Sequence, residues 1–160
     1  MLRDKNLIPL SRQHQHALAL CVRLDRALQE GEVDLDAWQS EIHSSFEQEI
    51  CVHFVAEEKD LFPPVSKFPK LRPIVDDLLA EHAALRDFFA RAAGRSLKKR
   101  DLQTFVRKLS SHIRKEEREL FEGMQGVMSE PELSAIGHAL EVSLQSATHA
   151  CKLSPRPPQA

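Results

Sequence analysis

Two ten-residue stretches of the chain place the same pair of potential metal ligands at the same spacing. HFVAEEKDLF starts at His53 and HIRKEERELF starts at His112. In each, a glutamate follows the histidine by four residues, and side chains at i and i+4 lie one above the other on a helix. A buried carboxylate is costly unless a cation meets it. Glu57 and Glu116, placed in this way, therefore predict a cationic partner.

Two further histidines fall on the apolar faces of predicted helices. At about 100 degrees per residue, His14 lies near the middle of the apolar stripe of the first predicted helix, whereas His16 lies on its opposite side. His82 shares a helix face with Leu78 and Leu85. The inward-facing polar residues, which we interpret as candidate metal ligands, are His14, His53, Glu57, His82, His112 and Glu116.

A single histidine on an apolar helix face is usually a hydrogen-bonded core residue, so the candidate ligands are considered as a set. Four core histidines with two unpaired carboxylates would cost on the order of several kcal/mol per buried ion. Two divalent cations would offset the carboxylate charge and bind imidazole in its neutral form. The alternative is a network of histidine–glutamate hydrogen bonds without metal.

Neighbouring polar residues have simpler interpretations. Glu58 and Glu117 are predicted to turn toward solvent, whereas Asp60 and Glu119 lie nearer the stripe edge and could hold the second ring nitrogen of a ligand. His43 also has a glutamate at i+4, but it points toward the flank of its helix, so we predict a surface pair. The histidines predicted to be exposed or packed, but not coordinating, are His16, His138 and His149.

Proline, glycine and apolar spacing predict an all-α protein, an up-down-up-down four-helix bundle with an additional C-terminal helix. We predict one domain over residues 1–150, with the metal-binding bundle at about 7–122, the extra helix at about 130–150, and a disordered tail at 151–160. The first predicted helix starts after Pro9, with Ser11 as its cap, and runs to the Gly31 region. The second runs from about Asp34 to Phe62, stopped by Pro63 and Pro64, and the third from near Pro73 to the Gly94 region. The fourth covers about 99 to 122 and ends at Gly123, and the fifth runs from a Ser129 and Glu132 capping box to about Ala150.

Composition limits the partners and the compartment. The 22 basic and 24 acidic side chains leave no basic surplus for nucleic acid. No apolar run reaches the roughly 20 residues of a membrane span, so we expect a cytoplasmic protein with no membrane association. The three cysteines are too few and too scattered for a disulfide framework and include no Cys-x-x-Cys pair, and tyrosine is absent from the sequence. Imidazole and carboxylate are therefore the expected metal donors.

At these residues the sequence resembles the hemerythrin-like HHE cation-binding domains. Their pattern is a histidine on helix 1, His-x-x-x-Glu on helix 2, a histidine on helix 3 and His-x-x-x-Glu or Asp on helix 4. The stretches LSRQH, HFVAEEKDLFP and EHAALR are similar in style to that family. The resemblance implies a non-haem di-iron site, oxo- or hydroxo-bridged, for which zinc or manganese could substitute. The implied ligands are His14 and His53 for one metal, His82 and His112 for the other, and Glu57 and Glu116 as bridges.

One departure from the family pattern affects the expected function. Oxygen-carrying hemerythrins have a further histidine one turn before the helix 3 ligand, where this chain has Leu78. Two histidines on each metal leave more open or water-filled positions, which disfavours reversible oxygen transport. Arg86, one turn after His82, is predicted to face inward as a gate or a hydrogen-bond donor, or to extend its charged end to solvent.

Three classes of function follow. The first is a di-iron protein that binds or senses O2, NO or peroxide, or responds to cellular iron or redox state. The second is a di-iron oxidase or peroxidase; its ferritin-like form is disfavoured because no Asp or Glu is followed by histidine at the third position. The third is a metal-stabilised module whose fifth helix docks a protein partner. Homo-oligomers are also compatible with the sequence.

Overall fold

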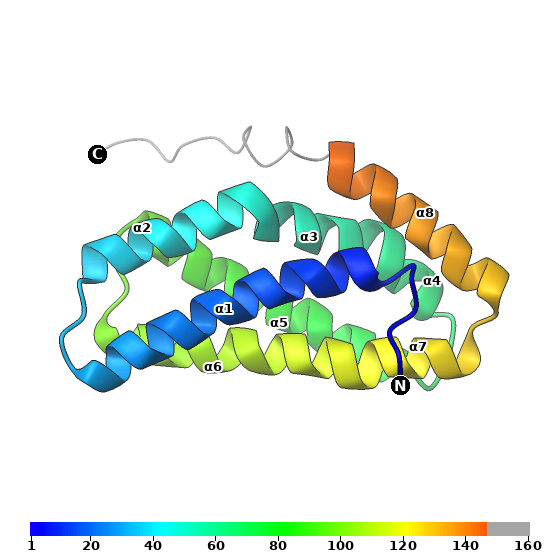
Figure 1. Ribbon diagram of the computed structural model, residues 1–160, viewed down its shortest axis with the longest axis horizontal. Helices are drawn as coiled ribbons and strands as arrows, with labels where there is room; N and C mark the ends of the chain where they lie inside the picture. The colour runs from blue at the N-terminus through cyan, green and yellow to red at the C-terminus, as the bar shows by residue number, and fades with distance from the viewer. Residues whose placement is uncertain (147–160) are drawn as a thin grey trace.

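The structure, a computed structural model, describes residues 1–146. This part of the chain contains helices and no strand, and four antiparallel rods form a bundle with a fifth helix along its outside (Figure 1). The predicted all-α bundle with an extra C-terminal helix is confirmed. The elements are α1 Ile8–Glu30; α2 Leu35–Ser45, η1 Phe46–Ile50, α3 Cys51–Ala56, η2 Glu57–Leu61 and α4 Phe62–Val65; α5 Arg72–Ala93; α6 Lys99–Lys115, η3 Glu116–Phe121 and α7 Glu122–Val127; and α8 Glu130–Ser146.

Helix α1 starts earlier than predicted. It begins at Ile8, with Pro9 in its first turn, where a missing N–H is tolerated. Leu7 precedes the helix without a side-chain cap, so the prediction that Ser11 caps the helix is wrong. The Ser11 hydroxyl instead donates to Glu117 Oε1 at 2.7 Å, which ties α1 to the fourth rod.

The second rod is one continuous helical path made of α and π turns, the latter closed by i→i+5 hydrogen bonds. Asp34, at the predicted start of the second helix, caps the rod, because its carboxylate accepts from the Ala37 N–H at 3.0 Å. The prediction that Pro63 and Pro64 stop the rod is wrong, since helical structure continues to Val65. The prolines lie in the first turn of α4, after the π turn η2, where their missing N–H groups are tolerated.

The fourth rod also extends beyond its predicted end at Gly123 and reaches Val127. A Cβ at Gly123 would lie 2.6 Å from Leu71 Cδ2, so this glycine allows close packing and does not end the helix. The capping box that opens α8 is confirmed: the Ser129 N–H donates to Glu132 Oε2 at 2.7 Å, and the Glu132 N–H donates to Ser129 Oγ at 3.4 Å. The predicted end of this helix near Ala150 and the predicted tail 151–160 lie outside the described residues.

Two apolar clusters fill the bundle and leave a polar layer between them. The first joins α1, α2, α5 and α6 through residues such as Leu24, Phe89 and Phe105. The second includes Phe62 and Phe121 and is covered on the outside by apolar side chains of α8. Burial of this apolar surface stabilises the rods on both sides of the polar layer. The candidate ligands are therefore held between two packed regions.

The π turns are located beside the polar layer. Two of them, η2 and η3, begin at Glu57 and Glu116, the two glutamates of the repeated motif. A π turn rotates less per residue than an α turn, and such turns are frequent at functional sites. The residues after each glutamate are consequently displaced from the positions that α-helical phase predicts. No helix within residues 1–146 is long and apolar enough to cross a membrane.

Candidate metal centre

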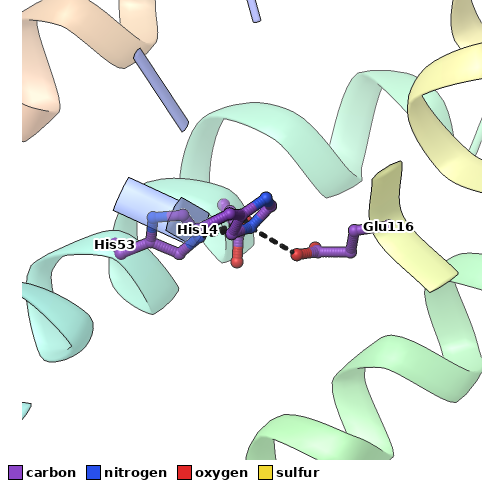
Figure 2. Close-up of side chains that lie close together, drawn as sticks. His14, His53 and Glu116 are labelled. Carbon is purple, nitrogen blue, oxygen red and sulfur yellow. Dashed lines mark hydrogen bonds and ion pairs between the residues drawn. The ribbon is translucent and has the colours of Figure 1, made fainter. Parts of the chain in front are cut away.

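The structure brings all six candidate ligands together in the polar layer. They come from all four rods, and their side chains are almost completely enclosed, with both glutamates 0 % exposed. Figure 2 shows His14 and His53 side by side, with the carboxylate of Glu116 directed toward them. The grouped residues are His14, His53, Glu57, His82, His112 and Glu116.

Each glutamate contacts histidines from both halves of the bundle. Glu57 Oε1 lies 2.8 Å from His53 Nε2, and Glu57 Oε2 lies 3.2 Å from His82 Nε2. Glu116 Oε2 lies 3.0 Å from His14 Nε2 and 3.6 Å from His112 Nε2. Both glutamates thus belong to two overlapping groups of four donors, and the donor atoms of each group lie within 4.8 Å of one another. Each of the two groups could hold a metal ion.

Most of the donor atoms are left without hydrogen bonds from the described residues. The exception is the contact of 3.1 Å between Nε2 of His14 and Nε2 of His53. Both carboxylate oxygens of Glu57 and Glu116 are buried without a hydrogen-bond partner, as are Nε2 of His82 and Nε2 of His112. The short contacts between them lack hydrogen-bond geometry, although buried polar atoms are normally paired. Convergent, unpaired nitrogen and oxygen atoms fit metal cations better than the alternative network of internal hydrogen bonds.

The outward nitrogens of two histidines are held by residues that sequence analysis placed in solvent. His14 Nδ1 lies 2.7 Å from Glu117 Oε1, and His82 Nδ1 lies 2.8 Å from Glu58 Oε1. The prediction that Glu58 and Glu117 turn toward solvent is therefore wrong. Each glutamate lies in a π turn and reaches a histidine on the neighbouring rod.

The other two outward nitrogens are held by residues that sequence analysis missed. His53 Nδ1 lies 2.7 Å from Gln13 Oε1, and His112 Nδ1 lies 2.8 Å from Glu81 Oε2. The sequence marks these two residues only by their position, because Gln13 directly precedes the candidate ligand His14 and Glu81 directly precedes the candidate ligand His82. We call Gln13, Glu58, Glu81 and Glu117 the outer partners. They fix the orientation of the rings and hence the direction of each Nε2.

The residues predicted for that role do something else. Asp60 accepts a hydrogen bond from Ser143, which links η2 to α8, and Glu119 is exposed. Neither contacts a candidate ligand in the described hydrogen bonds and ion pairs, so the prediction that they hold ring nitrogens is wrong. The prediction for the surface pair agrees with the structure: His43 is 37 % exposed and lies 3.2 Å from Glu47. His16 and His138 are exposed, whereas His149 lies outside the described residues.

Three cations balance the three acidic outer partners. Arg3 lies 2.8 Å from Glu117, and Lys115 lies 2.5 Å from Glu81. Arg86 donates to Glu58 at 2.5 Å and its guanidinium lies over the Phe54 ring, 5.5 Å from the centroid. Of the roles considered for Arg86, the structure therefore shows that of a hydrogen-bond donor. These ion pairs form a boundary between the buried donors and solvent.

Without metal, the centre holds positive charge as protons. Burial alone lowers the pKa of His14, but its close contacts with Glu116 and Glu117 and the negative charges of Glu116 and Glu57 outweigh it and raise the pKa to about 10. For Glu57, burial acts to raise the pKa, yet His53 and His82 hold it well below its ordinary value. A protonated imidazole and an ionised carboxylate thus stabilise each other, and a metal cation would replace that proton.

A small cavity adjoins the donors. It has a volume of about 10 Å³ and is lined by Gln13, His14, His53 and His112 together with apolar side chains such as Ile50. This is about the room that one water molecule needs. A larger surface pocket, about 550 Å³, lies between α5 and α6, and Glu81 is the residue of the centre that lines it. The size of the inner cavity restricts a ligand at the centre to a few atoms.

These features define a class of protein, a helical bundle with a buried nitrogen and oxygen site for metal cations. Residues 9–123 match the Hemerythrin HHE cation binding domain. Because the match covers most of the chain, the protein belongs to the hemerythrin HHE cation-binding family. No match was found among curated proteins or solved structures. The domain division at residue 150 and the ligand role of each residue stay predictions.

Proposed function

We propose that the protein binds two iron ions and uses them to bind or sense O2, NO or peroxide. The observation that supports this most strongly is that two buried, unpaired carboxylates each face histidines from both halves of the bundle. His14 and His53 would hold one ion and His82 and His112 the other. Glu57 and Glu116 would be shared between them.

The donor set favours a metal that accepts mixed imidazole and carboxylate ligation, which suits iron, manganese and zinc. Iron is preferred because the family resemblance implies it. When bound, an iron pair supplies reducing electrons and exchangeable coordination positions to a small ligand. The chain itself holds the four imidazoles in one orientation and excludes bulk water through its outer ion pairs.

A ligand of two or three atoms agrees with the space at the centre. The cavity beside the histidines holds about one water-sized molecule. Leu78 is fully buried in the second apolar cluster, at the position where a further family histidine would stand. Two histidines per ion leave coordination positions for a ligand, which supports binding or sensing over dedicated oxygen transport. A cytoplasmic location and a protein partner or second copy remain parts of this proposal.

The test is metal analysis combined with optical spectra of the iron-loaded protein. Anaerobic loading should give two iron ions per chain, and exposure to O2, NO or peroxide should change the spectrum in a stoichiometric way. Repeated turnover of peroxide would identify an oxidase or peroxidase instead of a sensor. Tightly bound zinc, with no iron uptake and no spectral response, would contradict the proposal and favour a metal-stabilised structural module.

A further inference from the structure

The two halves of the centre are related by an approximate twofold repeat. The His14 and His53 rings have centroids 4.8 Å apart at an interplanar angle of 55°, and the His82 and His112 rings have the same distance and angle. The pair of rings is therefore arranged alike in the two halves. The halves differ in a residue type behind the rings.

The four outer partners share three properties, so they show the same approximate twofold repeat as the rings. Each lies next in sequence to a candidate ligand, each reaches a histidine on another rod, and each lies 2.7 or 2.8 Å from the Nδ1 atom it holds. Glu117 on His14 corresponds to Glu58 on His82. Gln13 on His53 corresponds to Glu81 on His112, and only here does the residue type change.

A carboxylate and an amide hold an imidazole differently. An ionised carboxylate can only accept, so it fixes the proton on Nδ1 and leaves the Nε2 lone pair directed at the centre. Its charge also makes the imidazole a better metal ligand. An amide oxygen is a neutral acceptor, and a turn of the Gln13 amide would place an N–H donor there instead. Among the four candidate histidines, His53 is thus the one whose outward nitrogen faces an uncharged partner that could either accept or donate.

The cation beside Glu81 does not remove this difference. Lys115 binds Oε1 of Glu81, on the side away from the ring, while Oε2 faces His112 Nδ1. One oxygen of Glu81 thus stays in direct contact with the imidazole of His112, while the other pairs with the ammonium of Lys115.

We propose that the two metal positions bind unequally, with the His82 and His112 position tighter, and that Gln13 and Glu81 set the difference. This inference rests on the proposed two-metal function. With unequal affinities, the first ion would assemble the site, and the second ion would be bound more weakly and would be lost or exchanged more easily. Occupancy of the His14 and His53 position would then vary with metal supply. Both of these rings line the small cavity, together with His112 of the other position.

The experiment titrates the metal-free full-length chain with Zn²⁺, using chelator competition for affinities and long-range ¹H–¹⁵N spectra of the histidine rings to locate each ion. The wild-type chain should bind two ions with constants that differ by about tenfold or more. The rings of His82 and His112 should respond to the first equivalent. Before metal is added, His53 should be the ring that shows mixed tautomers.

Exchanging the residue types of Gln13 and Glu81 should reverse the order in which the two metal positions fill. Gln13→Glu should tighten the weaker step about tenfold, and Glu81→Gln should weaken the tighter step about 10- to 100-fold. In the double variant, His14 and His53 should respond first. Gln15→Glu, which adds the same charge at an exposed position of α1, is the matched control and should leave both constants unchanged. Circular dichroism would check that each variant keeps its helix content.

Different failures are distinguishable. Two zinc ions with equal constants in the wild-type chain, or unchanged constants in Gln13→Glu, would overturn the unequal positions while leaving the two-metal function intact. The same holds if His14 and His53 respond to the first equivalent in the wild-type chain. A chain that binds no zinc and no iron would overturn the proposed function and this inference together.

Discussion

The second rod carries the His-x-x-x-Glu spacing twice, ten residues apart, with opposite surroundings. His43 and Glu47 lie at the surface, 3.2 Å apart, with side chains 37 % and 56 % exposed. His53 and Glu57 lie 2.8 Å apart with side chains 5 % and 0 % exposed. In the surface pair, water solvates both charges and the contact contributes little to stability. In the buried pair, the carboxylate oxygens have no hydrogen-bond partner and need a cation.

The comparison shows that spacing alone does not define a metal site. The two pairs differ in whether histidines from other rods approach the glutamate. His14 and His82 approach Glu57, whereas the described contacts of Glu47 include no second histidine. The contrast provides internal controls. A substitution in the buried pair can be matched by the same substitution in the surface pair of the same rod.

The largest expected difference is in metal content. Glu57→Gln removes one of the two shared carboxylates, so iron or zinc retained after gel filtration should fall by at least tenfold, with loss of both ions. Glu47→Gln should retain the wild-type content, because its side chain is exposed. Inductively coupled plasma analysis of both variants measures the effect. Equal retention in the two variants would show that Glu57 does not bind metal.

A smaller effect is expected in the pH dependence of the metal-free protein. The pKa of His14 is raised above its ordinary value of 6.5 to about 10. A raised pKa contributes stability that is fully present below 6.5 and is lost as pH rises through about 10. The free energy of urea unfolding should therefore decrease between pH 7 and pH 10. The metal-loaded protein should lack this decrease, because the bound imidazole is already neutral.

Two substitutions test whether His14 causes this decrease in the free energy of unfolding. His14→Gln should remove most of the decrease, whereas His43→Gln should keep it. Metal binding at pH 8 should also release a proton from His14, which calorimetry in buffers of different ionisation enthalpy can count. A metal-free protein whose unfolding free energy is flat from pH 7 to pH 10 would contradict a protonated His14 in the centre.

Sequence reasoning predicted the rods and the inner donors because both depend on one periodicity. Apolar residues at three- and four-residue spacing define the face on which His14, His53, His82 and His112 lie, and the structure places all four there. The π turns could not be anticipated from that periodicity, so Glu58 was assigned to the wrong side of its helix. An error of this kind follows from assuming constant helical phase.

The other missed features depend on contacts between distant segments. The contact of Gln13 with His53 and that of Glu81 with His112 are set by how the rods pack, and adjacency in sequence does not reveal which ring each reaches. Gly123 continues a helix because Leu71 packs against it. Glycine and proline preferences predict local endings, and tertiary packing overrides them.

The smallest expected effect concerns the outer partner of a single ring. Glu117→Gln keeps a hydrogen-bond acceptor near His14 but removes the negative charge, so the affinity for the ion held by His14 should weaken about tenfold. The matched control is Glu47→Gln, whose carboxylate lies 3.2 Å from the exposed His43. Chelator competition with Zn²⁺ should detect the first change and show none for the second. If both variants weaken binding equally, general loss of negative charge would explain the result, and the contact between Glu117 and His14 would have no specific role in orienting the ring.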